Sequence, residues 1–261
     1  MHRATTTAVE ELIAGFMRRW LDDALPSGEL DRIRQDGASP SGLLAPFHDA
    51  LVPGITLLRE RSFSTRLGNL HEHVAVLIAS AAHQTATRAY ALSGDVPVLA
   101  REFITQRLHA LEAGSGAPDA ITERQALFQA FGQTVADSTT IDLRIVTHSD
   151  EEHFFEMKSA KPNKGQCIEM KQRLLTAMAI RRRSKTVAWW GVPYDPYGNA
   201  EYAHPYPVRF FDFAREVKVG ATFWNFVGND PTTYEELLGV YTRVGTATKR
   251  NSAKRWPDLR A

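Results

Sequence analysis

The fold is decided by three segments between residues 140 and 192, which read TIDLRIV at 140–146, HFFEMK at 153–158 and KTVAWWGV at 185–192. The first alternates with period two, as a half-buried β-strand does, and the polar turn HSDEE separates it from the second. We therefore expect a hairpin. A helix predicted from Gln166 to about Arg183 leads to the third strand. This order predicts an α/β fold, a mixed sheet with a crossover helix and flanking helices.

Helices are expected on both sides of this region. Apolar residues at helical spacing follow Thr7, which can cap the first helix, and PSG at 26–28 ends it. Further helices are predicted at about 64–84, 97–113, 121–136 and 232–244, and the tail from Thr246 is expected to be loosely held. We expect a single α/β domain over residues 1–261: a helical N-terminal elaboration at 1–60, a core at 61–245 and a basic tail at 246–261.

Composition excludes several classes of protein. The chain has 261 residues, 43% of them hydrophobic and 23% charged, with a net charge of +1, which is typical of a globular protein rather than a disordered chain or a rod. The single Cys167 excludes an internal disulfide framework and a zinc site of several thiolates. The N-terminus lacks an apolar signal region, and the longest apolar stretch, 74–82, is too short to span a bilayer. We expect a cytoplasmic protein with no membrane partner.

Two carboxylates and a lysine are expected to meet on the hairpin. Glu156 and Lys158 share one face of their strand, and Asp142 can lie across from them on the first strand. Carboxylate oxygens suit Mg²⁺, which would activate water, and a lysine can orient that water and offset negative charge. The pattern favours phosphodiester hydrolysis. The alternative is a surface strand with a solvated ion pair, since acid-x-lysine also occurs at Glu169/Lys171 and Glu216/Lys218.

Glu72 is a further candidate acid. It lies in a predicted helix that is apolar around most of its circumference, which indicates burial, and a buried carboxylate needs a cation or a metal. Glu72 could reach the metal site directly or through water. The alternative is a salt bridge to an arginine such as Arg66, or exposure to solvent.

The near-zero net charge hides a strong asymmetry. Residues 156–190 hold nine Lys and Arg against two Glu, a net charge of +7, and residues 243–261 add +5, so the rest of the chain carries −11. A basic cluster beside a carboxylate pair suits a polyanionic substrate such as nucleic acid. The alternative for the run Arg181–Arg183 is a solvated helix end that complements the helix dipole.

Several stretches also resemble a known family. They are FFEMKSAKPNKGQ at 154–166, SFSTRLGNLHE at 62–72, FWNFVG at 223–228 and YEELL at 234–238. They are similar to type II restriction endonucleases of the TdeIII and MjaII kind, which are specific for GGNCC and belong to the PD-(D/E)xK nucleases. The resemblance covers roughly residues 60 to 240. Ile141 stands where the superfamily motif has proline.

The resemblance implies a role for each residue of the site. Asp142 and Glu156 would hold Mg²⁺, Lys158 would serve the attacking water, and Glu72 would be the auxiliary acid of the first core helix. The partners would be double-stranded DNA, a second copy of the chain for a palindromic site, and a cognate DNA methyltransferase.

Basic and amide side chains after the catalytic strand are the expected DNA contacts, because Lys and Arg pair with guanine or phosphate and Asn and Gln with adenine. These are Lys161, Asn163, Lys164, Gln166, Lys171, Arg181, Arg182 and Arg183. The alternative is that they only contact phosphates or shape the loop. Two other functions stay open: a structure-specific DNA repair or recombination nuclease, and a non-catalytic nucleic-acid-binding protein on a nuclease fold.

Overall fold

The structure, a computed structural model, describes residues 1–24, 47–51, 60–195, 197, 202 and 204–255. Its helices are α1 (Arg3–Ala24), α2 (Phe47–Leu51), α3 (Glu60–Ala82), α4 (Val98–Ala113), α5 (Ala120–Gln129), α6 (Lys164–Arg181), α7 (Pro205–Phe210), α8 (Phe213–Glu216), α9 (Ala221–Val227) and α10 (Thr233–Arg255). Its strands are β1 (Thr85–Pro97), β2 (Thr134–Val146), β3 (Glu152–Met157), β4 (Thr186–Val192) and β5 (Val217–Val219).

The five strands form one mixed sheet in the order β1-β2-β3-β4-β5. β1, β2 and β3 pair antiparallel, and β3, β4 and β5 pair parallel, with α6 as the crossover between β3 and β4. The predicted hairpin, crossover helix and third strand are confirmed, as is the α/β class with helices flanking a mixed sheet.

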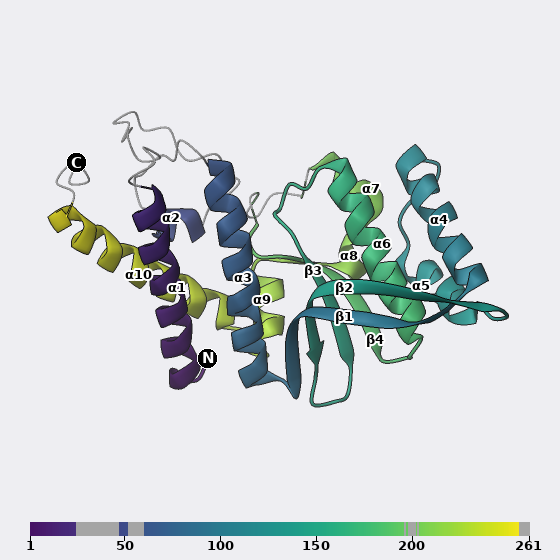
Figure 1. Cartoon of the computed structure of the whole chain (residues 1–261), viewed down its shortest axis with the longest axis horizontal. Coiled ribbons are helices and arrows are strands. Elements are labelled where there is room, and N and C mark those ends of the chain that lie inside the picture. The colour runs from purple at the N-terminus through teal and green to yellow at the C-terminus, as the bar shows by residue number, and fades with distance from the viewer. Residues whose placement is uncertain (25–46, 52–59, 196, 198–201, 203, 256–261) are drawn as a thin grey trace.

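The sheet lies between two groups of helices (Figure 1). α6 packs on one face together with α4, α5, α7 and α8, whereas α3 and α9 lie on the other side with α1, α2 and α10 beyond them. Neighbouring residues of β3 show the two faces. The Phe155 ring packs against Phe223 and Phe226 of α9, whereas Glu156 contacts Arg173 of α6. All six residues of β3 are buried, so this central strand is covered on both faces.

The structure differs from the sequence prediction in three elements near the sheet edge. β1 was not predicted, because it is a long edge strand whose side chains are mostly exposed and lack a clear apolar alternation. The helix predicted to reach residue 136 ends at Gln129, because Ala130 is extended and Gly132 has a φ of +100°. Residues 134–139 instead lengthen β2, which pairs along β1 as far as Pro97↔Thr134.

The terminal helices also differ from the prediction. α1 begins at Arg3, so Thr7 is not its cap and its hydroxyl donates to the Arg3 carbonyl. α10 continues to Arg255 instead of ending near Gly245. A Cβ on Gly245 would lie 1.9 Å from the Ala50 carbonyl oxygen. This glycine therefore permits close packing on α2 rather than ending the helix, and the expected loose tail is helical as far as Arg255.

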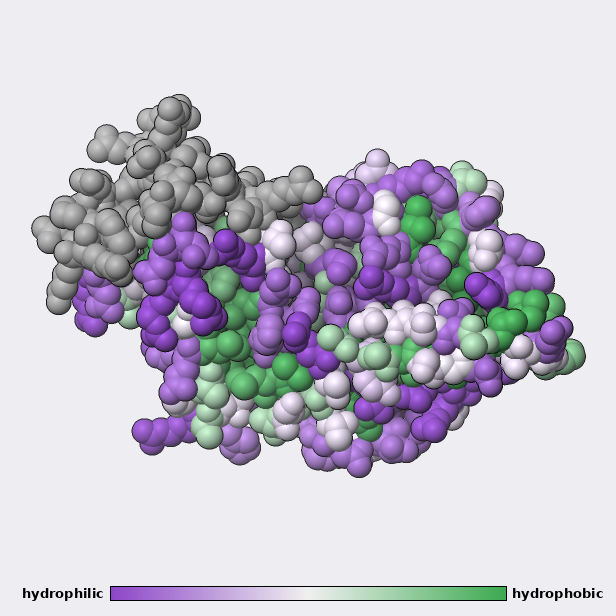
Figure 2. Space-filling model, viewed as in Figure 1, coloured by the Kyte–Doolittle hydropathy of each residue, from purple (hydrophilic) through white to green (hydrophobic). Residues whose placement is uncertain are grey.

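The molecular surface is mixed in polarity. Figure 2 shows hydrophilic and apolar residues interspersed over α1 and α3, and an apolar area at the end of the paired strands β1 and β2, where Leu99 and Phe131 are exposed. Among the described residues, no helix is both long and apolar enough to cross a membrane.

Candidate active site

The β2–β3 hairpin brings the predicted acid pair and lysine together. Leu143 pairs with Phe155, so the next position along the two strands places Asp142 beside Glu156. The Met157 N–H donates to Asp142 Oδ2 at 2.8 Å, and Lys158 Nζ lies 3.5 Å from the same oxygen. The backbone thus fixes one oxygen of Asp142, and the lysine stands at the partly exposed side of the cluster.

Glu156 is the most buried member of this cluster. Its side chain is fully buried, Oε2 lies 3.4 Å from Arg173 Nη1, and Oε1 has no hydrogen-bond partner. Desolvation, and then repulsion from Asp142, raise the pKa of Glu156 to about 8, against the attraction of Arg173 and Lys158. A buried carboxylate oxygen without a donor is costly for a fold and requires an explanation. A cation bound between Glu156 and Asp142 would supply the missing partner.

Glu72 of α3 completes the group from another layer of the fold. Its side chain is 18% exposed, and Arg88 Nη1 of β1 lies 3.1 Å from its Oε2. Burial and repulsion from Asp142 raise the pKa of Glu72, whereas Arg88 and Lys158 lower it, so its charge acts on the same site. The alternative partner Arg66 is excluded, because Arg66 pairs with Asp23 at 2.6 Å.

The donor set fits a hard divalent cation that keeps much of its hydration. The part of the chain that the structure describes has no group of three or more His, Cys, Asp or Glu side chains arranged to hold a metal ion. The site instead offers the two carboxylates of Asp142 and Glu156, with Glu72 nearby. Mg²⁺ is commonly bound by one or two carboxylates while water and substrate phosphate fill its other positions.

Two arginines of the site were not singled out from the sequence. Arg173 pairs with Glu156 and, one helical turn back, with Glu169, while Arg88 pairs with Glu72. The i, i+4 spacing of Glu169 and Arg173 was the only available signal for Arg173. Arg88 could not be placed because β1 was not predicted.

The loop after β3 uses its amides to start α6. Asn163 and Gln166 form a capping box, in which each side-chain oxygen accepts the other residue's backbone N–H at 2.9 Å. Lys164 pairs with the exposed Glu112, and Lys161 Nζ lies 5.2 Å from the Tyr197 ring centre. These side chains therefore shape the loop, and their contact with DNA stays a prediction.

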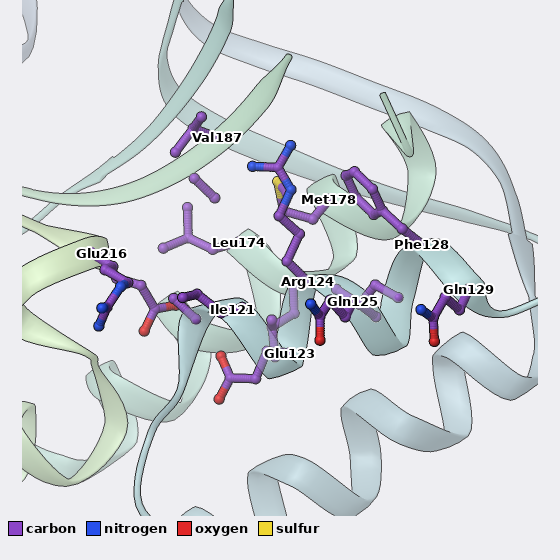
Figure 3. A pocket seen from close by; sticks show the side chains of 15 residues that line it. Ile121, Glu123, Arg124, Gln125, Phe128, Gln129, Leu174, Met178, Val187 and Glu216 are labelled. Carbon is purple, nitrogen blue, oxygen red and sulfur yellow. The ribbon is translucent and has the colours of Figure 1, made fainter. Parts of the chain in front are cut away.

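The expectation that Lys171 contacts DNA is wrong. Its side chain is 0% exposed, and Nζ lies 2.5 Å from both Glu123 Oε2 of α5 and Glu216 Oε1 of α8. Arg107 of α4 also pairs with Glu123, at 2.7 Å. A cavity of about 430 Å³ lies beside these acids, between α5, α6, α8 and β4 (Figure 3). Lys171 is thus a buried cation that joins α6 to α5 and α8 through ion pairs. A run of basic residues in the sequence does not show which of their side chains are buried.

The arginines at the end of α6 lie far from the site. α6 has 18 residues and is ~27 Å long, so Arg181 is remote from the loop after β3. Arg181 Nε lies 3.1 Å from Glu152 at the start of β3, and Arg182 donates to the Phe128 carbonyl. Arg181 and Arg182 thus have partners within the protein, and their contact with DNA stays a prediction. Arg183 is exposed, and its contact with DNA stays a prediction.

Comparison with known proteins gives matches over most of the chain. The model of the family described as "Type II restriction endonuclease, HinfI" matches residues 1–245, which include the N-terminal helices. The type II restriction enzymes HgiCII and HgiEI of Herpetosiphon aurantiacus are 33% and 35% identical to the chain, over 83% and 80% of both sequences. MjaII of Methanocaldococcus jannaschii is 22% identical over 69% of the chain and 52% of that enzyme.

Proposed function

The chain belongs to the HinfI family of type II restriction endonucleases, which are site-specific deoxyribonucleases, and we propose that it cuts double-stranded DNA with Mg²⁺ held between Asp142 and Glu156. Enzymes of this class generally use a divalent metal ion. The observation that carries the proposal is the buried, unpartnered Oε1 of Glu156 beside Asp142 and Lys158. We assign residues 61–245 of a single domain to a PD-(D/E)xK nuclease core, and the meeting of Asp142, Glu156 and Lys158 supports this proposal.

Each residue of the site has a distinct role in this proposal. Asp142 and Glu156 would hold the metal, and the Met157 N–H fixes the orientation of the Asp142 carboxylate. A bound divalent ion would polarise the scissile phosphate and lower the pKa of a bound water. Lys158 orients the attacking water and offsets the negative charge that develops on the phosphate. Glu72 assists from α3 as the auxiliary acid.

We propose a short palindromic target and a homodimer that matches its two-fold symmetry. GGNCC is the first site to test, because the resemblance to the MjaII kind implies it. The candidate DNA contacts are the free amide groups of Asn163 and Gln166 together with the exposed or half-exposed cations Lys161, Lys164, Arg181, Arg182 and Arg183. A cytoplasmic location and a cognate DNA methyltransferase follow from the same function, because the host's own DNA must be protected.

Digestion of phage DNA in the presence of Mg²⁺ tests the proposal. The wild-type protein should give discrete fragments whose sequenced ends share one palindrome, and the ends will confirm or replace GGNCC. Asp142→Ala and Lys158→Ala should bind the same DNA without cutting it. Asp150→Asn is the matched control on the exposed hairpin turn, because Asn also accepts the φ of +62° found there.

The outcomes separate the proposal from its alternatives. Cleavage of flaps or junctions without sequence-specific fragments would support a structure-specific nuclease instead. Metal-independent DNA binding with no turnover over a range of divalent ions would support a non-catalytic binding protein. Full cleavage by either site variant would overturn the assignment of the active site.

A further inference from the structure

An irregular residue interrupts β1 opposite the proposed metal ligand. In the pairing of β1 with β2, Arg88 lies opposite Leu143 and Tyr90 lies opposite Ile141. Ala89, which would lie opposite Asp142, is the one residue missing from this otherwise continuous register. Ala89 has a φ of +48°, a left-handed conformation that is costly for a residue with a Cβ. Such strain is retained where the surrounding structure demands it, often at functional sites.

The bend at Ala89 separates the directions of its two neighbours. In a regular strand, residues two apart project to the same side of the sheet. Here the Tyr90 ring stacks on Phe154, and its hydroxyl accepts a hydrogen bond from Arg181 of α6 at 2.6 Å. Arg88 instead reaches Glu72 of α3, which belongs to the other group of helices. The bend therefore lets one short stretch of β1 contact both helical layers.

Arg88 is suited to hold Glu72 in place. Its guanidinium Nη1 donates to Glu72 Oε2 at 3.1 Å, and the two side chains are 37% and 18% exposed. The influence of Asp142 on the Glu72 carboxylate is unfavourable and larger than the favourable influence of Lys158, so Glu72 needs a further cation to stay ionised at this position. The arginine offsets this repulsion and limits the rotamers that Glu72 can adopt.

We propose that Arg88, aimed by the bend at Ala89, is a positioning residue that fixes the Glu72 carboxylate of α3 for its role at the site. This inference rests on the proposed nuclease function and assigns a role to two residues of the edge strand. The competing role for Arg88 is direct contact with a DNA phosphate, since a guanidinium has donors that Glu72 does not use. The two roles differ in whether Arg88 acts through Glu72.

A double-mutant cycle on cleavage kinetics separates the two roles. If Arg88 acts through Glu72, then Arg88→Gln and Glu72→Gln should each lower kcat by roughly 10–100-fold, the range seen when residues that orient a metal site are lost. The double variant should lose no more than the worse single variant, because only one interaction is removed. KM and metal-free DNA binding in EDTA should not change, and Arg88→Lys should recover part of kcat.

Variants of Ala89 test the bend without touching either charge. Ala89→Gly should keep wild-type kcat, since glycine accepts positive φ, whereas the β-branched Ala89→Val should lower kcat as Arg88→Gln does. Arg66→Gln is the matched control, because it removes an arginine of α3 that pairs with Asp23 instead. Far-ultraviolet circular dichroism and melting temperature must show that each variant is folded.

Three outcomes would overturn the inference. The first is full activity of Arg88→Gln. The second is a double variant in which the kcat losses of Arg88→Gln and Glu72→Gln multiply. The third is a rise in the KM of Arg88→Gln together with a smaller salt dependence of DNA binding, which would indicate a phosphate contact. None of these outcomes affects the nuclease assignment, provided that the wild-type protein cuts DNA and Asp142→Ala does not. Failure of the wild-type protein to cut would instead reject the proposed function.

Discussion

Replacing Glu156 with glutamine should stabilise the metal-free protein at neutral pH while abolishing cleavage. Burial and Asp142 raise the pKa of Glu156 to about 8 in the folded protein, from 4.5 for the free side chain. When the pKa of an acid is higher in the folded protein than in the unfolded chain, the protein is most stable below the unfolded pKa. Its stability is then lost as the pH rises from the unfolded pKa through the folded pKa. Glutamine keeps the shape of the side chain and removes this pH-dependent cost.

The magnitude follows from the size of the pKa shift. One pKa unit corresponds to ~1.36 kcal/mol, so the raised pKa of Glu156, which makes folding take up a proton, lowers stability by about 3 kcal/mol at pH 7 and by less than about 1 kcal/mol at pH 5. Arg173 is not left unpaired by the substitution, because it also contacts Glu169. The melting temperature of Glu156→Gln in EDTA should therefore exceed that of the wild-type protein by roughly 5–10 °C at pH 7.

The assay is thermal unfolding followed by circular dichroism at pH 5, 6, 7 and 8 in EDTA. The difference between variant and wild type should grow with pH, and Asp150→Asn should show no such trend. Adding Mg²⁺ should raise the melting temperature of the wild-type protein more than that of the variant, since the metal binds the ionised carboxylate. A variant that is less stable at pH 7, or a gain that does not change with pH, would refute the reasoning.

Two further predictions concern residues outside the acid cluster. Lys171→Met leaves Glu123 and Glu216 without the cation that they share. It should lower the free energy of unfolding, measured in urea titrations, by about 3–5 kcal/mol. Adding Glu216→Gln to this variant should recover part of the loss. Unchanged stability of Lys171→Met would contradict the buried link. Gly245→Ala places a methyl group against the Ala50 carbonyl and should cost about 1–3 kcal/mol, measured in the same titration, whereas Gly239→Ala, in a roomier position of α10, serves as the control.

The central part of the fold was predictable because its sequence signals are local. The strands around Asp142 and Glu156 show period-two alternation or a short apolar run, and a polar turn joins them. β1 gives no such signal, because it is an edge strand with mostly exposed side chains and is held by its long pairing with β2. The role of Gly245 was also hidden, since a close approach between helices looks like a helix end in the sequence.

Long-range charge pairing was the part of the site that the sequence could not specify. Asp142 and Glu156 could be predicted to meet, because the register of a hairpin follows from its turn. Partners from different layers follow no such rule, so Glu72 was assigned a possible pairing with Arg66 although the structure pairs it with Arg88. For the same reason, the basic segment 156–190 was interpreted as a DNA-facing surface although Lys171 lies inside the protein.

The pairing of charges explains how three acids can share a site that must accept a polyanion. Each carboxylate has its own cation: Lys158 for Asp142, Arg173 for Glu156 and Arg88 for Glu72. When all three carboxylates are ionised, the formal charges of these six groups sum to zero, which reduces the repulsion that three bare carboxylates would exert on DNA. Because the cations come from the loop after β3, from α6 and from β1, the balance exists only when the whole sheet and both helical layers are assembled. Folding and substrate tolerance are thus coupled at the same residues.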